Sequence, residues 1–335
     1  MENKYKVVRL NCRLFPVISE EIDTLSKVNA NLIRIQGDEI PPEFMDADVL
    51  MVVSAKVKGE VIKQLSRCGL IARIGIGTDK IDVDEATANG ILVTNVPGFC
   101  KSELADHTIL LLLSTARKIV QLDKNTRASN LNIRNEVVMR RIAGKKLGLV
   151  GFGELARSVA HRAKAFDLEI FAYDPYIEAN EMEKFNVVKV NSLENILKEC
   201  DFVSLHLPLT DKTFHLIGEE QLKMMKPTAI LINTARGAIV DEDALVKALS
   251  EHWIEAAGID VFEKLNPFEE VPTKQFSPLF LLDNVVLTPH VAATSVESLI
   301  EVQTRAAQEV ARVISGKWPE NCINPEVIPR YPLSK

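Results

Sequence analysis

The chain has few of the residues from which small disulfide-bonded or metal-bound proteins are built. Its five cysteines lie far apart in the sequence, and no Cys-x-x-Cys pair occurs. That spacing excludes a disulfide framework and the common zinc motifs, and it favours a reducing, cytoplasmic setting. The six histidines show no metal-ligand spacing either, so we expect no metal cofactor.

Long apolar runs and a strong charge of one sign are also missing. The amino-terminal residues MENKYKVVRLNC contain no apolar signal-peptide region, and the longest apolar run, Ile109 to Leu113, is far too short to span a bilayer. The net charge is −6, and lysines and arginines are scattered along the chain. We therefore expect neither a membrane nor a nucleic acid as partner.

Short β-rich segments alternate with helical ones along the 335 residues, which are too many for one typical domain. This alternation predicts an α/β fold with parallel sheets. A first set of strands is expected at Tyr5–Leu10, Leu32–Ile35, Val49–Val53, Leu70–Ile74 and Ile91–Thr94, with helices at Ser19–Val28, Lys58–Arg67 and Val83–Asn89. A second set is expected at Lys146–Val150, Glu169–Tyr173, Val187–Val190, Phe202–Leu207, Ala229–Asn233, Ala256–Asp260 and Val285–Thr288.

An amphipathic stretch from Lys101 to about Lys124 predicts one long crossover helix between the two sets, and the polar segment Asn125–Ile142 predicts an arm or interface loop. A last helix, from Ser295 to about Ser315, stops at Gly316. We expect this helix to return to the first domain. The predicted architecture is two Rossmann-like or flavodoxin-like domains with a cleft between them, formed by residues 1–100 with 294–335 and by residues 101–293.

The sharpest local motif opens at Gly151. A strand leads into Gly151-x-Gly153-x-x-Ala156, and a helix over Leu155–Phe166 follows. Glycines at these places permit a tight turn and a close backbone approach to a pyrophosphate, which the helix N-terminus also attracts. Asp174 ends the next strand, where a carboxylate accepts hydrogen bonds from ribose hydroxyls and repels a 2′-phosphate. The pattern predicts a dinucleotide site that prefers NAD over NADP.

Two polar residues follow the ends of later strands. Arg236 comes just after the strand that ends at Asn233, where a guanidinium can grip a carboxylate and polarise a carbonyl. His290 follows the last strand, and histidine is the natural proton donor or acceptor between a carbonyl and a hydroxyl at neutral pH. Each residue alone could be structural, but both at strand ends of one dinucleotide domain predict a catalytic pair.

Nearly the whole chain resembles the D-isomer-specific 2-hydroxyacid dehydrogenases, including the branch of phosphoglycerate dehydrogenase and C-terminal-binding-protein-like members. The resemblance rests on Arg73–Asp82 (RIGIGTDKID), Val93–Gly98 (VTNVPG), Ser204–Thr210 (SLHLPLT), Asn233–Asp241 (NTARGAIVD), Gly258–Phe262 (GIDVF) and Leu287–His290 (LTPH). It implies an NAD-dependent oxidoreductase that transfers a hydride between nicotinamide and a D-2-hydroxyacid/2-oxoacid pair. It also implies that the discontinuous domain binds substrate, and that the protein is a homodimer built largely from the NAD domain.

The resemblance also implies roles for single residues. Ile76 and Gly77 would present backbone N–H groups to the substrate carboxylate, Arg236 would bind that carboxylate and the reacting oxygen, and His290 would be the acid/base. The residues that it implies at the NAD site are Gly151, Phe152, Gly153, Glu154, Leu155, Asp174, His206, Pro208, Thr213, Thr234, Ala235, Arg236, Asp260 and His290.

One position departs from the family pattern. Family members carry a glutamate that pairs with the catalytic histidine, and this chain has Leu265 at that position. A carboxylate beside an imidazole raises its pKa and fixes its tautomer, so its loss matters for the acid/base step. Glu263, Glu269 or Glu270 reaches His290 instead, or His290 works alone, or the protein is an NAD(H)-binding, redox-responsive or corepressor-like module with little turnover. Glu263 is our candidate for the third catalytic residue.

Overall fold

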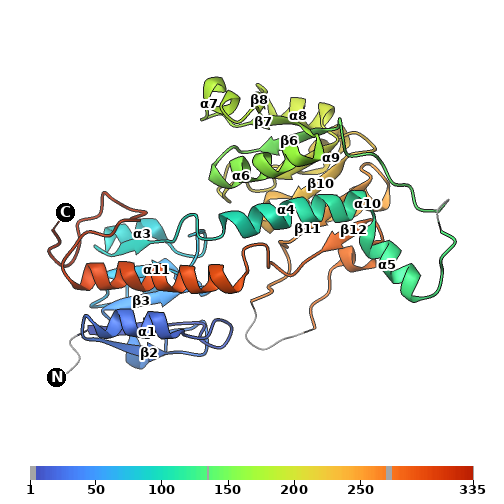
Figure 1. The fold of residues 1–335 in the computed structure, drawn as a ribbon. Coiled ribbons are helices and arrows are strands. Elements are labelled where there is room, and N and C mark those ends of the chain that lie inside the picture. The colour runs from blue at the N-terminus through green and yellow to red at the C-terminus, as the bar shows by residue number, and fades with distance from the viewer. Residues whose placement is uncertain (1–4, 134–135, 269–273, 335) are drawn as a thin grey trace. The chain divides into compact units, whose positions relative to one another are not determined.

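The computed structural model describes residues 5–133, 136–268 and 274–334, and these fall into two compact units. The first unit contains the described residues up to Phe99, Phe268, and the residues from Ser295 onward. The second contains Cys100–Pro267 and Lys274–Thr294. Figure 1 shows that each unit is a parallel sheet with helices on its faces.

The first unit has a five-stranded parallel sheet in the order β2-β1-β3-β4-β5. Successive residues of a strand face opposite sides of the sheet. Val7 therefore packs in the core between the sheet and helices α1 and α11, and Val8 packs in the core on the opposite face of the sheet. Such strands are buried on both faces, which explains their continuous apolar runs. The elements are β1 (Tyr5–Arg9), α1 (Ser19–Ser26), β2 (Ala30–Arg34), η1 (Pro42–Phe44), β3 (Val49–Val52), α2 (Gly59–Ile62), β4 (Leu70–Arg73), α3 (Val83–Ala88), β5 (Leu92–Thr94) and α11 (Val296–Ile314).

The second unit has a seven-stranded parallel sheet in the order β12-β11-β10-β9-β6-β7-β8. Its strands are β6 (Lys146–Val150), β7 (Glu169–Tyr173), β8 (Val188–Lys189), β9 (Phe202–Leu205), β10 (Ile230–Asn233), β11 (Ala256–Ile259) and β12 (Val285–Leu287). Its helices are α4 (Lys101–Ala116), α5 (Ile119–Arg127), α6 (Glu154–Ala163), η2 (Lys164–Phe166), α7 (Ala179–Glu183), α8 (Leu193–Glu199), α9 (Glu219–Met224), η3 (Gly237–Ile239), α10 (Glu242–Ser250) and η4 (Pro278–Leu281). One core lies under α4 and α6, and another lies under α8, α9 and α10. The α/β class with two parallel sheets, expected from the sequence, is confirmed.

The expected crossover helix is wrong in one respect, because it is two helices. The chain leaves α4 at Ala116 and resumes as α5 at Ile119, and Lys118 between them has a left-handed backbone with φ 53°. A left-handed residue cannot continue a right-handed helix. The expected helix at Lys58–Arg67 is also shorter, since α2 ends at Ile62.

The last helix begins and ends as the sequence predicts. The Ser295 hydroxyl accepts a hydrogen bond from the backbone N–H of Ser298 at 2.9 Å, which caps the start of α11. Gly316 follows the end of α11 with φ 78°, a conformation that glycine adopts readily. In the parts of the chain that the structure describes, no helix combines the length and the apolar character needed to cross a membrane.

Candidate active site

The turn from β6 to α6 has the geometry of a dinucleotide cradle. Gly151 has φ 91°, and a Cβ atom there would lie 2.5 Å from the carbonyl oxygen of His206. Gly153, by contrast, has open space within 4 Å of its Cβ position, immediately before the first turn of α6. Gly151 therefore shapes the turn, whereas Gly153 leaves room for a ligand against the helix N-terminus. These two features fit a bound pyrophosphate.

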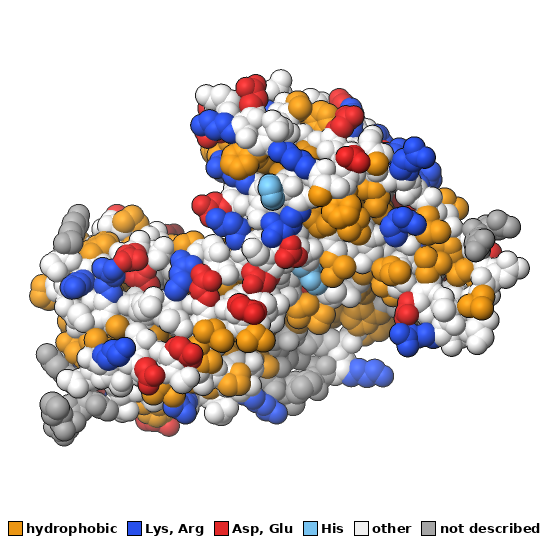
Figure 2. All heavy atoms as spheres, in the orientation of Figure 1, with side chains coloured by type: hydrophobic (Ala, Val, Ile, Leu, Met, Phe, Trp, Pro, Cys, Tyr) orange, Lys and Arg blue, Asp and Glu red, His pale blue; other side chains and the backbone are white. Residues whose placement is uncertain are grey.

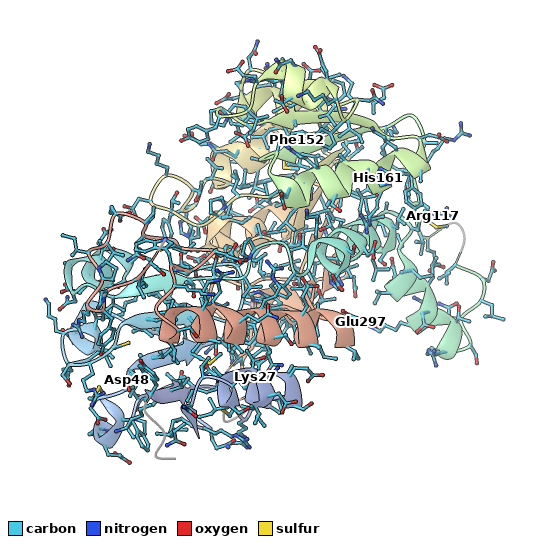
Figure 3. All side chains as sticks on the ribbon, turned by 60° about the vertical axis from the view of Figure 1, so that its left-hand side comes forward. Lys27, Asp48, Arg117, Phe152, His161 and Glu297 are labelled. Atoms are coloured by element: carbon cyan, nitrogen blue, oxygen red, sulfur yellow. The ribbon has the colours of Figure 1, made fainter. Side chains whose placement is uncertain are left out.

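Asp174 is held beside this turn by backbone groups. One carboxylate oxygen accepts from the N–H of Phe152 at 2.9 Å, and the other accepts from the N–H of Tyr176 at 2.9 Å. The carboxylate is thus fixed at the end of β7, where a ribose would bind. The Phe152 side chain is fully buried and packs against the ring of Phe185, so only its backbone can serve a cofactor. Figure 3 labels Phe152 in the second unit.

The first two residues of α6 differ in exposure. The exposed side chain of Glu154 pairs with Lys101 at 2.9 Å, and Leu155 is half-buried. The Glu154 carboxylate would repel a phosphate. Any contact of Glu154 with a phosphate would therefore be made by its backbone N–H, which lies in the first turn of the helix.

His206 follows β9 and lies against Gly151. Its Nε2 is 2.9 Å from the hydroxyl oxygen of Ser204, and burial lowers the pKa of its imidazole to about 4. His206 is therefore neutral at physiological pH. Farther along the same loop, the Thr213 hydroxyl donates to the carbonyl of Pro208 at 2.6 Å and closes the turn. These contacts make Thr213 a residue that shapes the loop and leave Pro208 exposed.

Arg236 stands three residues beyond β10, in a turn that Asn233 organises. The Asn233 side chain donates to the carbonyl of Arg236 at 2.9 Å and accepts from the N–H of Ala235 at 3.0 Å. The guanidinium of Arg236 donates to the Ala235 carbonyl at 2.8 Å. Thr234 is buried, and its hydroxyl lies 2.9 Å from that of Thr108 on α4.

Asp260 holds the turn that carries His290. It directly follows β11, is fully buried, and its carboxylate accepts from the N–H groups of Val291 at 2.9 Å and Ala292 at 3.0 Å. The backbone carbonyl of Asp260 accepts from the N–H of His290 at 2.7 Å. His290 itself has φ 58°, a left-handed conformation that these surrounding bonds maintain.

Two further residues join this network whose part in it we did not foresee from the sequence. The Thr288 hydroxyl donates to the Asp260 carboxylate at 2.6 Å, and Nε2 of His107 on α4 lies 3.0 Å from the same hydroxyl. Since Thr288 gives its only proton to Asp260, His107 must donate through Nε2. His107 lies 3.6 Å from the Asp260 carboxylate.

The carboxylate of Glu263 contacts His215 and the start of α10 in the structure. It lies 2.7 Å from Nε2 of His215 and accepts from the backbone N–H of Glu242 at 3.2 Å. Glu242 in turn accepts from the N–H of Glu263 at 3.0 Å, so the two carboxylates tie the loop after β11 to the start of α10. Glu269 and Glu270 lie outside the described residues.

In the first unit, Ile76 and Gly77 lie in the loop that follows β4. Among the residues that the structure describes, no group accepts a hydrogen bond from the backbone N–H of either residue. The side chains of Arg73 and Asn95 hold the carbonyls of the same loop. In the described ranges, no cluster of histidine, cysteine or carboxylate side chains could hold a metal ion.

Comparison with known proteins gives a consistent result. A profile of the D-isomer specific 2-hydroxyacid dehydrogenase, NAD binding domain, matches residues 109–292. A glyoxylate reductase of Korarchaeum cryptofilum is 40% identical over 316 residues, which are 91% of this chain and 93% of that protein. A D-3-phosphoglycerate dehydrogenase of Methanocaldococcus jannaschii is 40% identical over 299 residues, which are 89% of this chain but only 56% of that longer protein.

A solved structure agrees with these matches. The D-lactate dehydrogenase of Aquifex aeolicus, solved with NAD and lactic acid, is 28% identical to this chain and superposes with a TM-score of 0.83. The similarity covers 92% of this chain and 96% of that one. The likeness therefore extends through both units, and the residues that the family profile matches include the turn at Gly151.

Proposed function

Because the chain belongs to the D-isomer specific 2-hydroxyacid dehydrogenase family and is an NAD-dependent 2-hydroxyacid dehydrogenase, we propose that Arg236 and His290 interconvert a small 2-oxoacid and its D-2-hydroxyacid. One observation carries the assignment. Arg236, Asp260 and His290 follow β10, β11 and β12, which are neighbours in the sheet, so all three lie at its carboxyl edge. Ligands of open parallel sheets bind at that edge.

Each residue has a role that its chemistry suits. Arg236 binds the substrate carboxylate and draws electron density toward the carbonyl oxygen, which makes the carbonyl carbon more electrophilic. His290 donates a proton to that oxygen during reduction and removes it during oxidation. When bound, NADH supplies the hydride. Asp260 does not touch the substrate in this scheme and instead fixes the turn on which His290 sits.

The substrate carboxylate receives further hydrogen bonds in this proposal. The N–H groups of Ile76 and Gly77 supply them. The names of the relatives suggest glyoxylate and 3-phosphoglycerate as starting points for the substrate search.

A second function has one observation in its favour. Leu265 stands where the family has its histidine-paired glutamate, and Glu263 is engaged by His215 and Glu242. An NAD(H)-binding module with little turnover would tolerate a leucine at this position, whereas an efficient enzyme would orient His290 through other groups.

Two measurements on the same samples separate these functions. NADH oxidation is followed at 340 nm with glyoxylate, pyruvate and larger 2-oxoacids with and without a second anionic group, and NADH binding is measured by fluorescence. We expect turnover of at least one 2-oxoacid, a loss of about 10²-fold or more in His290→Ala, and NADH binding that is still measurable in that variant because the glycine turn is intact. Tight NADH binding without turnover of any 2-oxoacid would favour the binding module.

We also propose that the protein is a cytoplasmic homodimer. All five cysteines are free thiols, which suits a reducing compartment. Figure 2 shows hydrophobic side chains at the surface around α4 and α5, where Leu110, Ile119 and Val120 are each more than half exposed. A second copy of the chain would cover these residues.

A further inference from the structure

In the loop after β4, each of four consecutive carbonyl groups is held by a hydrogen bond. The carbonyls of Ile74 and Gly77 accept from the guanidinium of Arg73, the latter at 2.9 Å. The Gly75 carbonyl accepts from the N–H of Val96 at 2.9 Å. The Ile76 carbonyl accepts from the side-chain amide of Asn95 at 2.7 Å. A surface loop would normally leave most of these groups to water.

A hydrogen bond that fixes the direction of a carbonyl also fixes the direction of the N–H in the same peptide group. In a trans peptide the C=O and the N–H of the next residue lie in one plane and point in opposite directions. The bond from Val96 to the Gly75 carbonyl therefore sets the direction of the Ile76 N–H. The bond from Asn95 to the Ile76 carbonyl sets the direction of the Gly77 N–H. Two adjacent residues after β5 thus orient the two amides that our proposed function assigns to the substrate carboxylate.

The local sequence makes this arrangement possible. Gly75 has φ 144°, and a Cβ atom there would lie 2.5 Å from a guanidinium nitrogen of Arg73. Any other residue would be strained at this φ and would displace the Arg73 guanidinium, so glycine suits a turn in which Arg73 reaches the carbonyls on both sides. The Arg73 guanidinium also places positive charge beside the loop, which favours an anion.

We propose that Asn95 is a positioning residue that aims the Gly77 N–H at the carboxylate of the 2-oxoacid. The inference rests on the proposed function, because it presumes that this carboxylate binds at Ile76 and Gly77. Asn95 does not touch the substrate. It acts through the Ile76–Gly77 peptide, and Val96 performs the matching task for the Ile76 N–H through its own backbone.

The test exchanges the donor for an acceptor of the same size. Asn95→Asp replaces the amide NH₂ with a carboxylate oxygen that repels the Ile76 carbonyl, so the peptide rotates away. We expect KM for the 2-oxoacid to rise about 10- to 100-fold, as expected for the loss of an oriented hydrogen bond to a charged group. NADH affinity should stay within about twofold, and Asn95→Gln, which keeps the donor, should recover part of the loss.

Asn89→Asp is the matched control. The side-chain amide of Asn89, at the end of α3 in the same unit, donates to the Glu85 carbonyl at 2.8 Å and to the Glu85 carboxylate at 2.7 Å. The same chemical change there should lower the stability of this unit and leave KM unchanged. If Asn95→Asp raised KM less than twofold, or if both variants changed Tm and KM in parallel, the positioning role would be overturned.

A second measurement does not depend on turnover. Amide NMR shifts of Ile76 and Gly77 are recorded as oxamate, a carboxylate analogue of a 2-oxoacid, is added with NADH present. In the wild type both amides should shift, and in Asn95→Asp the Gly77 shift should largely disappear while the Ile76 shift persists. Equal loss at both amides would overturn the specific role of Asn95. If oxamate moved neither amide in the wild type, the proposed carboxylate site itself would fail.

Discussion

Leu265 stands where the family resemblance implies a glutamate, and the structure shows the contacts of the acidic residue nearest to it in sequence. The nearest acidic residue in sequence, Glu263, is turned toward His215 and the start of α10. For Glu263 to take the place of that glutamate, its contacts with His215 and with the backbone N–H of Glu242 would have to break. Asp260 supports the His290 turn, because its carboxylate accepts hydrogen bonds from two N–H groups and from the Thr288 hydroxyl.

A carboxylate introduced at position 265 should change the rate of 2-oxoacid reduction. We expect Leu265→Glu to raise kcat for 2-oxoacid reduction and to extend activity to higher pH, because a nearby anion keeps the imidazole protonated. Steady-state rates from pH 5 to 9 measure both effects, and Leu265→Gln, which has the size without the charge, is the control. Equal profiles for the two variants would show that charge at this position does not limit the reaction.

His206 should make stability depend on pH. Burial lowers the pKa of its imidazole to about 4 in the folded protein, against an ordinary value of 6.5. Well above pH 6.5 the ring is neutral in both the folded and the unfolded protein, so no folding stability is lost. As pH falls toward 4, the unfolded chain binds a proton that the folded chain refuses, so folding stability decreases.

The expected size of this effect is about 2 kcal/mol between pH 7 and pH 4.5, allowing for partial access of water to the ring. Urea unfolding of the cofactor-free protein at both pH values measures it. His206→Gln keeps a hydrogen-bonding group near Ser204 but does not titrate, so it should lose about 2 kcal/mol less than the wild type. Identical losses in both proteins would contradict the assignment.

Residues whose role is set by local backbone chemistry could be predicted from the sequence, whereas long-range side-chain partners could not. Gly151 needs a positive φ and Asp174 must follow the next strand, and both requirements leave a local signature. The partner of Glu263 is His215, from an earlier loop, and no periodicity reports such a pair. Asn95 likewise lies in the Val93–Gly98 motif, whose sequence alone does not indicate that the Asn95 side chain binds the Ile76 carbonyl.

At the scale of elements, the β6–α6 turn shows two glycines with separable tasks. We expect Gly151→Ala to lower Tm by several degrees, because a residue at φ 91° is strained and its Cβ would meet the His206 carbonyl. Gly153→Ala should leave Tm within about 2 °C, since nothing lies within 4 Å of its Cβ position. It should nevertheless weaken NADH binding about tenfold or more, because the methyl group occupies the space for the pyrophosphate.

Thermal melts and NADH titrations of the two variants check this contrast. Each variant is the control for the other, because the change in side chain is the same and the positions are two residues apart. A stable Gly153→Ala protein with wild-type NADH affinity would mean that the dinucleotide does not approach this part of the turn.

The break between α4 and α5 shows why element boundaries escape the sequence. Apolar residues continue beyond the break at Ile119, Val120 and Leu122, so the helical pattern runs through it. The chain turns at Lys118, a residue type with no preference for the left-handed conformation. The ends of α11 were predictable by contrast, because Ser295 and Gly316 are ordinary start and stop signals.

For the whole molecule, alternating strands and helices predicted two parallel sheets, but not the order of their strands. In the second unit β6 lies between β9 and β7, and the four strands from β9 to β12 extend the sheet from one side of it. This order follows from right-handed crossovers that reverse direction at β6, a rule of topology and not of local pattern. The reversal places the Gly151 turn at the point where such sheets bind ligands.

The apolar surface of the second unit leads to a prediction about assembly. Leu110, Ile119 and Val120 on α4 and α5, and Leu131 in the segment after α5, are 52–73% exposed, and monomeric proteins rarely leave several large apolar side chains of one region in water. We expect light scattering at micromolar concentration to give twice the 37.3 kDa mass of the chain.

The double variant Ile119→Glu/Val120→Glu should give the mass of one chain, because buried unpaired carboxylates cost several kcal/mol at an interface. Val188→Glu, at a valine that is also 56% exposed but lies on β8, should remain a dimer. A dimeric double variant, or a monomeric wild type, would exclude the α4–α5 surface as the interface.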